Sequence, residues 1–270
     1  MSDELMAENF DSYYSAGERA VPMDTVMRKL DEYLGRDDYV RAEAHLRFWI
    51  GESEIRRDGM GRLVLLNELM GLLRKTSKCE AAIETAQRAL ALCSELGLVG
   101  RAIHGTTLVN AATVYKAFDR AAEALPLYRE AMTVYEATLP ENDARRGGLY
   151  NNMALALVDL AQYDEAEAMY RRALDVMSNN RFGELEMAVT YLNMANEAEA
   201  RYGLIPAEER INEYIDRARE LLDTPGIPHD GYYAFVCEKC APTFEYYGYF
   251  LDAGEFRERA RRIYAENSGQ

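Results

Sequence analysis

The sequence predicts an all-α, right-handed solenoid, a stack of helical hairpins that grows by addition instead of closing around one core. Three observations support this prediction. A segment that begins at Leu108 recurs in altered form at Tyr150, 42 residues later. Apolar residues follow helical spacings of three and four nearly throughout the chain. Residue types that favour helices are abundant, and only 7 prolines are present.

The helical periodicity predicts about six hairpins after an N-terminal helix, with turns at Gly, Pro, Asp and Asn. The N-terminal helix falls within residues 1–22 and presents Met6, Phe10, Tyr13 and Tyr14 on one face. The hairpins cover 24–34 with 38–55, 60–75 with 79–97, 101–118 with 121–138, 144–161 with 164–178, 184–202 with 206–223, and 229–251 with 255–266. The first five hairpins span 24–223, and the last, 229–266, carries a polar surface suited to a cap. Because no linker or change of composition interrupts residues 1–270, we expect a single domain.

The alanines of the repeat follow from how helices pack. Two helices approach closely only where a small residue lies at their crossing, and Ala112 and Ala154 are expected there in the first helices. One position near the start of each second helix tracks the repeat. It is occupied by Ala42, Ala82, Ala124, Ala166, Ile211 and Arg259. Tyr128 and Tyr170 lie one turn after two of these alanines and are expected to fill the space between units.

These residues resemble the tetratricopeptide repeat pattern. A small residue is followed three residues later by Tyr115 or Leu157, nine later by an alanine, and then by an aromatic residue four further on. That family's usual repeat has about 34 residues, so the step of 42 is similar to the kinesin-light-chain subclass. The resemblance is strong over 101–178, fair over 38–97 and 184–222, and weak beyond 225. A HEAT-like array shares this repeat length but would not require the small–aromatic spacing.

The resemblance implies a concave groove, lined by the first helices of the hairpins, that takes an extended peptide. In the third hairpin it points to Asn110, Thr113 and Lys116. In the fourth and fifth it points to Asn151, Asn152, Asn193 and Asn196.

Asn110, Asn152 and Asn193 form the most specific part of this set, because they stand two residues before Ala112, Ala154 and Ala195. An amide both donates and accepts, so it can pair with the main chain of an extended ligand without reading its side chains. The alternative is that these asparagines bond between neighbouring helices and only hold the stack. Both roles remain open at this stage.

Composition limits the class of partner. Acidic residues outnumber basic ones 46 to 31, and the net charge of −15 argues against nucleic acid. The charge is compatible with a basic partner segment. No apolar run is long enough for a membrane span, and the acidic N-terminus does not look like a secretory signal. The four cysteines are too few and scattered for a disulfide framework, which fits the cytoplasm.

No motif indicates an enzyme, a metal site or a cofactor. Cys237 and Cys240 form a C-x-x-C within an expected helix, where buried small hydrophobes are the favoured interpretation. The aromatic run Tyr246–Phe250 favours packing of the last hairpin over a dimer or partner contact. We therefore expect a non-catalytic scaffold that binds a protein or peptide. Self-association into a homo-oligomer and a peptide-sensing role are the alternatives.

Overall fold

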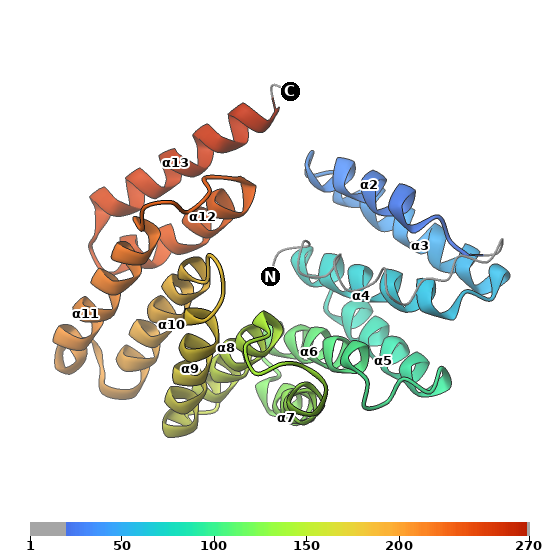
Figure 1. Cartoon of the computed structure of the whole chain (residues 1–270), viewed down its shortest axis with the longest axis horizontal. Coiled ribbons are helices and arrows are strands. Elements are labelled where there is room, and N and C mark those ends of the chain that lie inside the picture. The colour runs from blue at the N-terminus through green and yellow to red at the C-terminus, as the bar shows by residue number, and fades with distance from the viewer. Residues whose placement is uncertain (1–19, 269–270) are drawn as a thin grey trace. The chain divides into compact units, whose positions relative to one another are not determined.

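The computed structural model describes residues 20–268 of the 270-residue chain. The helix expected within residues 1–22, with Met6, Phe10, Tyr13 and Tyr14, therefore lies almost wholly outside the described residues. Residues 20–268 form helices and short turns without any strand, which confirms the all-α prediction (Figure 1). None of these helices combines the length and hydropathy that crossing a lipid bilayer requires.

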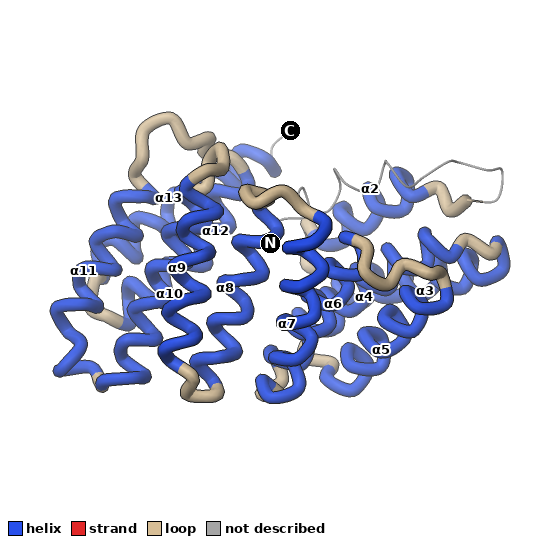
Figure 2. Tube along the Cα trace, turned by 60° about the horizontal axis from the view of Figure 1, so that its bottom comes forward, coloured by secondary structure: helices blue, strands red, loops and turns tan. Residues whose placement is uncertain are grey.

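The helices of the described chain pair in order as antiparallel hairpins, and Figure 2 shows the helices of each half packed side by side. The first three hairpins are α2 (Met23–Leu34) with α3 (Tyr39–Arg56), α4 (Gly59–Lys75) with α5 (Cys79–Glu95), and α6 (Ala102–Ala117) with α7 (Ala121–Thr138). The next three are α8 (Ala144–Asp159) with α9 (Tyr163–Ser178), α10 (Glu184–Tyr202) with α11 (Leu204–Leu222), and α12 (Gly231–Tyr246) with α13 (Phe250–Ser268).

Contacts divide the chain into two compact units that meet in sequence after Leu139. Unit 1 holds α2 to α7, and unit 2 holds α8 to α13. First helices of successive hairpins contact one another within each unit, α4 with α6 in unit 1 and α10 with both α8 and α12 in unit 2. Within each unit, we call the surface of these helices the first-helix face of that unit. The expectation of one domain over residues 1–270 stays a prediction.

Each hairpin turn in the described chain contains one residue with a left-handed backbone. These residues are Asp37, Ser77, Asp119, Ala161, Gly203 and Gly248, with φ from 53° to 88°. In most of these turns the next N–H bonds back to the end of the first helix. Gln162, for example, donates to the Leu157 carbonyl at 2.9 Å, which satisfies an otherwise unpaired helix C-terminal carbonyl. The turns recur every 40 to 45 residues, so the repeat is visible in the backbone itself.

The second helices follow a more regular register than the sequence suggested. Their fourth residue is always a buried alanine, and these are Ala42, Ala82, Ala124, Ala166, Ala207 and Ala253. The structure thus corrects the last two expected positions, Ile211 and Arg259, which lie one turn or more further along their helices. Only a small side chain fits at this helix crossing, which excludes the bulky Ile211 and the charged Arg259.

The last hairpin also differs from its expected boundaries. Its first helix ends at Tyr246, and its turn is centred on Gly248 instead of Asp252 to Gly254. Gly248 has a φ of 88°, a conformation that costs glycine almost nothing. Gly254 instead lies inside α13, where its helical backbone makes no use of that freedom.

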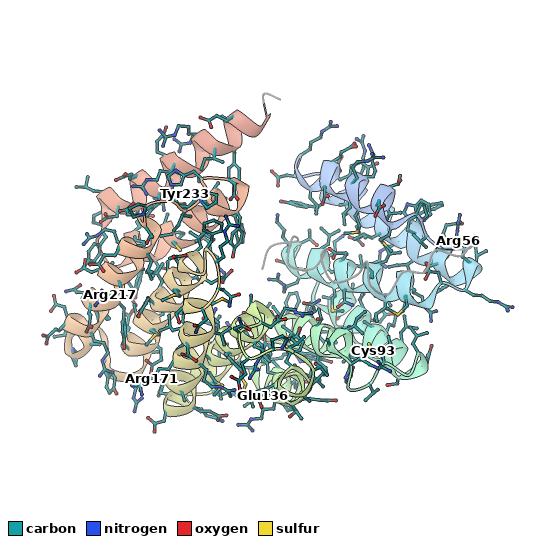
Figure 3. The ribbon with its side chains drawn as sticks, in the orientation of Figure 1. Arg56, Cys93, Glu136, Arg171, Arg217 and Tyr233 are labelled. Atoms are coloured by element: carbon teal, nitrogen blue, oxygen red, sulfur yellow. The ribbon has the colours of Figure 1, made fainter. Side chains whose placement is uncertain are left out.

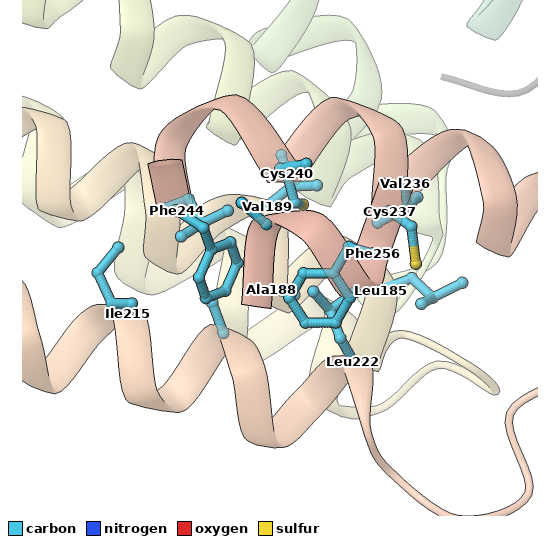
Figure 4. Close-up of a cluster of buried hydrophobic side chains, with 14 of the residues drawn as sticks. Leu185, Ala188, Val189, Ile215, Leu222, Val236, Cys237, Cys240, Phe244 and Phe256 are labelled. Atoms are coloured by element: carbon cyan, nitrogen blue, oxygen red, sulfur yellow. The ribbon is translucent and has the colours of Figure 1, made fainter. Parts of the chain in front are cut away.

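The core of unit 2 explains the two cysteines of the C-x-x-C. Cys237 and Cys240 project from α12 into a cluster with Leu185, Phe244 and Phe256 (Figure 4). Both thiols are free and buried, and burial raises the pKa of Cys237 to about 11 and that of Cys240 to about 12. They serve as small apolar residues between α10, α12 and α13.

Candidate functional site

The first-helix face of unit 1 contains a chain of amides. Asn110 on α6 donates from Nδ2 to Oδ1 of Asn67 on α4 at 2.8 Å. Asn67 is buried and in turn donates to the Leu63 carbonyl at 2.9 Å and lies 3.3 Å from Thr107 Oγ1. One amide–amide bond therefore joins the first helices of successive hairpins.

Unit 2 repeats this arrangement. Asn193 on α10 donates from Nδ2 to Oδ1 of Asn151 on α8 at 3.1 Å. Asn151 is buried, whereas Asn193 is half-buried. The partners are 42 residues apart in unit 2 and 43 apart in unit 1, so the amide bond follows the repeat of the fold.

The neighbouring Asn152 differs from Asn151. It is half-buried, and within residues 20–268 its amide makes no hydrogen bond. The sequence placed Asn152 in line with Asn110 and Asn193, but the residue of α8 that bonds Asn193 is Asn151. Of the two adjacent asparagines in α8, Asn151 is hydrogen-bonded to the next first helix, and Asn152 is available for other contacts.

Thr113 and Lys116 stand on the same helix as Asn110 in different surroundings. Thr113 lies 3.0 Å from the Tyr128 hydroxyl on α7 and donates to the Val109 carbonyl at 2.8 Å. Its side chain therefore faces the second helix of its own hairpin. Lys116 is half-buried in the last turn of α6.

Asn196 belongs to a polar cluster between α10 and α12 that the sequence did not predict as a unit. The Tyr247 hydroxyl lies 3.1 Å from Asn196 Oδ1 and 2.8 Å from Glu199 Oε2. Tyr246 donates to the other oxygen of Glu199 at 2.8 Å. Burial and the bond to Glu199 raise the pKa of Tyr247, so its hydroxyl keeps its proton at neutral pH. The run Tyr246–Phe250 thus only partly packs the hairpin, because Tyr246 and Phe250 are exposed.

Two carboxylates of α10 lie against tyrosines of the last hairpin. Glu186 accepts from the Tyr232 hydroxyl, and Glu199 accepts from two tyrosines. In the described part of the chain neither carboxylate is paired with Lys or Arg, so neutral phenols bind them without cancelling their charge. Figure 3 shows how densely side chains cover both units. No group of three or more His, Cys, Asp or Glu within residues 20–268 is arranged to hold a metal ion.

Comparison with known proteins identifies the repeat. A tetratricopeptide repeat model matches residues 62–137, most of α4 to α7, and a second one matches residues 148–177 in α8 and α9. Residues 62–137 and 148–177 of this chain therefore carry tetratricopeptide repeats. No curated protein matches its sequence.

Solved structures share the tetratricopeptide repeat fold of this protein. The TPR-like repeats of a Podosopora anserina protein described as a kinesin light chain align with a TM-score of 0.53 and 16% identity, covering 76% of this chain and 96% of that one. BtubC (BKLC) from P. vanneervenii aligns with a TM-score of 0.54 and 19% identity, covering 91% and 93%. A Rap protein complexed with Competence and Sporulation Factor gives 0.51 and 14%, covering 89% and 74%. At these identities the likeness concerns the fold.

Proposed function

We propose that this protein is a non-catalytic scaffold that binds an extended segment of a protein or peptide along the first-helix face of a single unit. The proposal rests on one observation: a hydrogen bond to the preceding first helix holds the side-chain amides of Asn110 and Asn193 in place. Asn110 and Asn193 each spend one N–H on the preceding first helix, which leaves a second N–H and the Oδ1 for a ligand. The two roles left open by the sequence are therefore compatible, since the bond that holds the stack also orients the amide.

Two carboxylates on the first-helix face of unit 2 support a basic partner segment. Glu186 and Glu199 face no cation among residues 20–268, and the whole chain carries a net charge of −15. A basic peptide would be attracted, and an acidic one repelled. The Rap protein of similar fold was solved with a bound factor, which supports a peptide or protein as the class of ligand.

Asn152 provides the test, because its amide is not used by the stack. Peptides selected from a random library on the wild-type chain would be titrated against Asn152→Ala. Loss of one net hydrogen bond should weaken binding about 2- to 10-fold while the unfolding midpoint stays unchanged. Gln162→Ala, an exposed amide in the α8–α9 turn with no capping bond, serves as the matched control.

Asn151→Ala measures the contribution of the Asn151–Asn193 bond to stability, apart from any role in ligand binding. It removes the acceptor of Asn193 and should lower stability by about 1 kcal/mol. If Asn152→Ala binds the selected peptides as tightly as wild type does, or if they bind the Gln162 surface instead, the first-helix face is not the binding site.

A second candidate function, self-association, is favoured by one specific observation. Large apolar side chains are exposed at the turns of the last two hairpins of unit 2. They are Tyr202, Leu204, Ile205, Tyr246, Phe250 and Leu251, of which Ile205 is 85% and Leu251 90% exposed. Light scattering over a range of concentrations tests this candidate. A monomer at all concentrations excludes it, and a dimer that dissociates in Leu251→Asp supports it.

A further inference from the structure

The outward face of α3 carries a second apolar stripe, opposite to the one that it buries. Val40, Ala44, Phe48, Gly51 and Ile55 follow one another at spacings of four, four, three and four, so they share one side of the helix. Val40 is 80% exposed, Phe48 60% and Ile55 78%. A methyl group built on Gly51 would meet nothing within 4 Å.

The buried side of α3 shows that this stripe is not part of the hairpin packing. Ala42, Leu46, Ile50 and Ser53 face the core of unit 1, and they alternate along the helix with the stripe residues. A helix in a globular protein has one apolar face and one polar face, so two apolar faces on α3 indicate that a further element covers the outer one.

The chain enters the described structure near the C-terminal end of α3. The Ala20 carbonyl accepts from Arg56 Nη1 at 3.4 Å, and the Val21 N–H donates to Asp58 at 2.9 Å. Arg56, labelled in Figure 3, is the last residue of α3 and follows Ile55 directly. The described chain therefore begins at the end of α3 that carries Ile55.

We propose that the N-terminal segment, residues 1–19, docks on the stripe of α3 with Met6, Phe10 and Tyr13 against Phe48. The reach is sufficient, because the six residues from Tyr14 to Ala20 span up to about 20 Å and Phe48 lies about 12 Å along the helix from Arg56. The tether keeps the local concentration of the segment high, so a modest apolar contact is enough to hold it.

The entry point of the chain favours this occupant, because residues 1–19 join the described structure at the end of α3 that carries Ile55. Charge does not separate it from a second copy, since Arg41 and Arg47 beside the stripe are already paired with Asp38 and Glu43.

Hydrogen exchange of the full chain, read by mass spectrometry, tests the docking. Amides in residues 6–14 should exchange at least about tenfold more slowly in wild type than in Phe48→Asp, which places a charge on the stripe. Val99→Asp is the matched control, since Val99 is an exposed apolar residue of unit 1 at 59% exposure that lies outside α3. In Val99→Asp, the amides of residues 6–14 should exchange at the wild-type rate.

Phe10→Asp tests the same contact from the side of the N-terminal segment. It should abolish the same protection, and combining it with Phe48→Asp should cause no further loss, because both changes break one contact. The proposal is overturned if residues 6–14 exchange rapidly in wild type or keep their protection in Phe48→Asp. It is equally overturned if Phe48→Asp dissociates a dimer in light scattering while residues 6–14 are unprotected, since the stripe would then bind a second copy.

Discussion

At the scale of single residues, unit 2 contains a buried carboxylate without an adequate partner. Glu197 on α10 is only 4% exposed, its Oε1 accepts no hydrogen bond within residues 20–268, and Arg201 Nη1 lies 3.9 Å away. Burial raises the pKa of this carboxyl above 4.5, and Arg201 offsets only part of the effect. The nearby Tyr170 hydroxyl is also buried and unbonded, which matches the replacement of Thr113 by Leu155 one repeat later.

We expect Glu197→Gln to stabilise the protein at neutral pH by about 1 kcal/mol, because a neutral amide costs less to bury than a carboxylate. A carboxyl whose pKa is raised by folding contributes its full stability below 4.5 and loses it as the pH rises through the folded-state pKa. The gain from glutamine should therefore be present at pH 8 and shrink towards pH 5. Urea unfolding at the two pH values measures it. A variant less stable than wild type at pH 8 would contradict this account.

At the scale of helices and hairpins, close approach depends on two glycines in equivalent positions. Gly105 on α6 and Gly147 on α8 are 42 residues apart. A methyl group on Gly105 would lie 2.6 Å from the ring of Tyr135, which a hydroxyl contact with Thr106 at 2.9 Å holds in place. A methyl group on Gly147 would lie 2.6 Å from the end of Met177, a flexible side chain.

The two alanine variants should therefore change the free energy of unfolding in opposite directions. Gly105→Ala should destabilise the protein by about 1–3 kcal/mol, because the fixed ring cannot move away. Gly147→Ala should be neutral or stabilising by up to about 1 kcal/mol, since Met177 can change rotamer and alanine is the better helix former. Thermal unfolding of the pair provides the comparison. Equal losses in both would show that Met177 is as constrained as Tyr135.

The helices also show what the sequence could predict. Their boundaries followed from periodicity and turn residues, and most lie within two or three residues of those observed. The turn at Gly248 was missed because Asp252 to Gly254 carries an equally strong turn pattern, and only the burial of Ala253 in α13 decides between them. Asn67 could have been found by stepping 43 residues back from Asn110. The Glu199 cluster could not, because Tyr246 and Tyr247 stand 47 and 48 residues after Glu199, away from the repeat step.

At the scale of the whole molecule, the open question is whether the two units unfold together. Each unit has its own buried cluster, and the only tryptophan, Trp49, packs against that of unit 1. Repeat stacks are held by contacts between neighbours, and cooperativity passes from one hairpin to the next. We expect a single transition, as the single-domain prediction requires.

Trp49 makes this measurable without labelling. Its fluorescence follows unit 1, while circular dichroism at 222 nm follows the helices of both units. The two urea midpoints should coincide in wild type. Phe244→Ala, which opens a cavity in unit 2, should then lower both midpoints together. Separate midpoints would divide the chain into two domains near Leu139.

The bond between Asn151 and Asn193 has a further consequence for how such a chain can be lengthened. It joins equivalent positions 42 residues apart, and each asparagine belongs to a different hairpin. Inserting a second copy of residues 142–183 would add one hairpin and supply one more asparagine at the same interval, with no change elsewhere in unit 2. Repeat number can therefore vary by duplication while the connecting hydrogen bond is regenerated at each new junction.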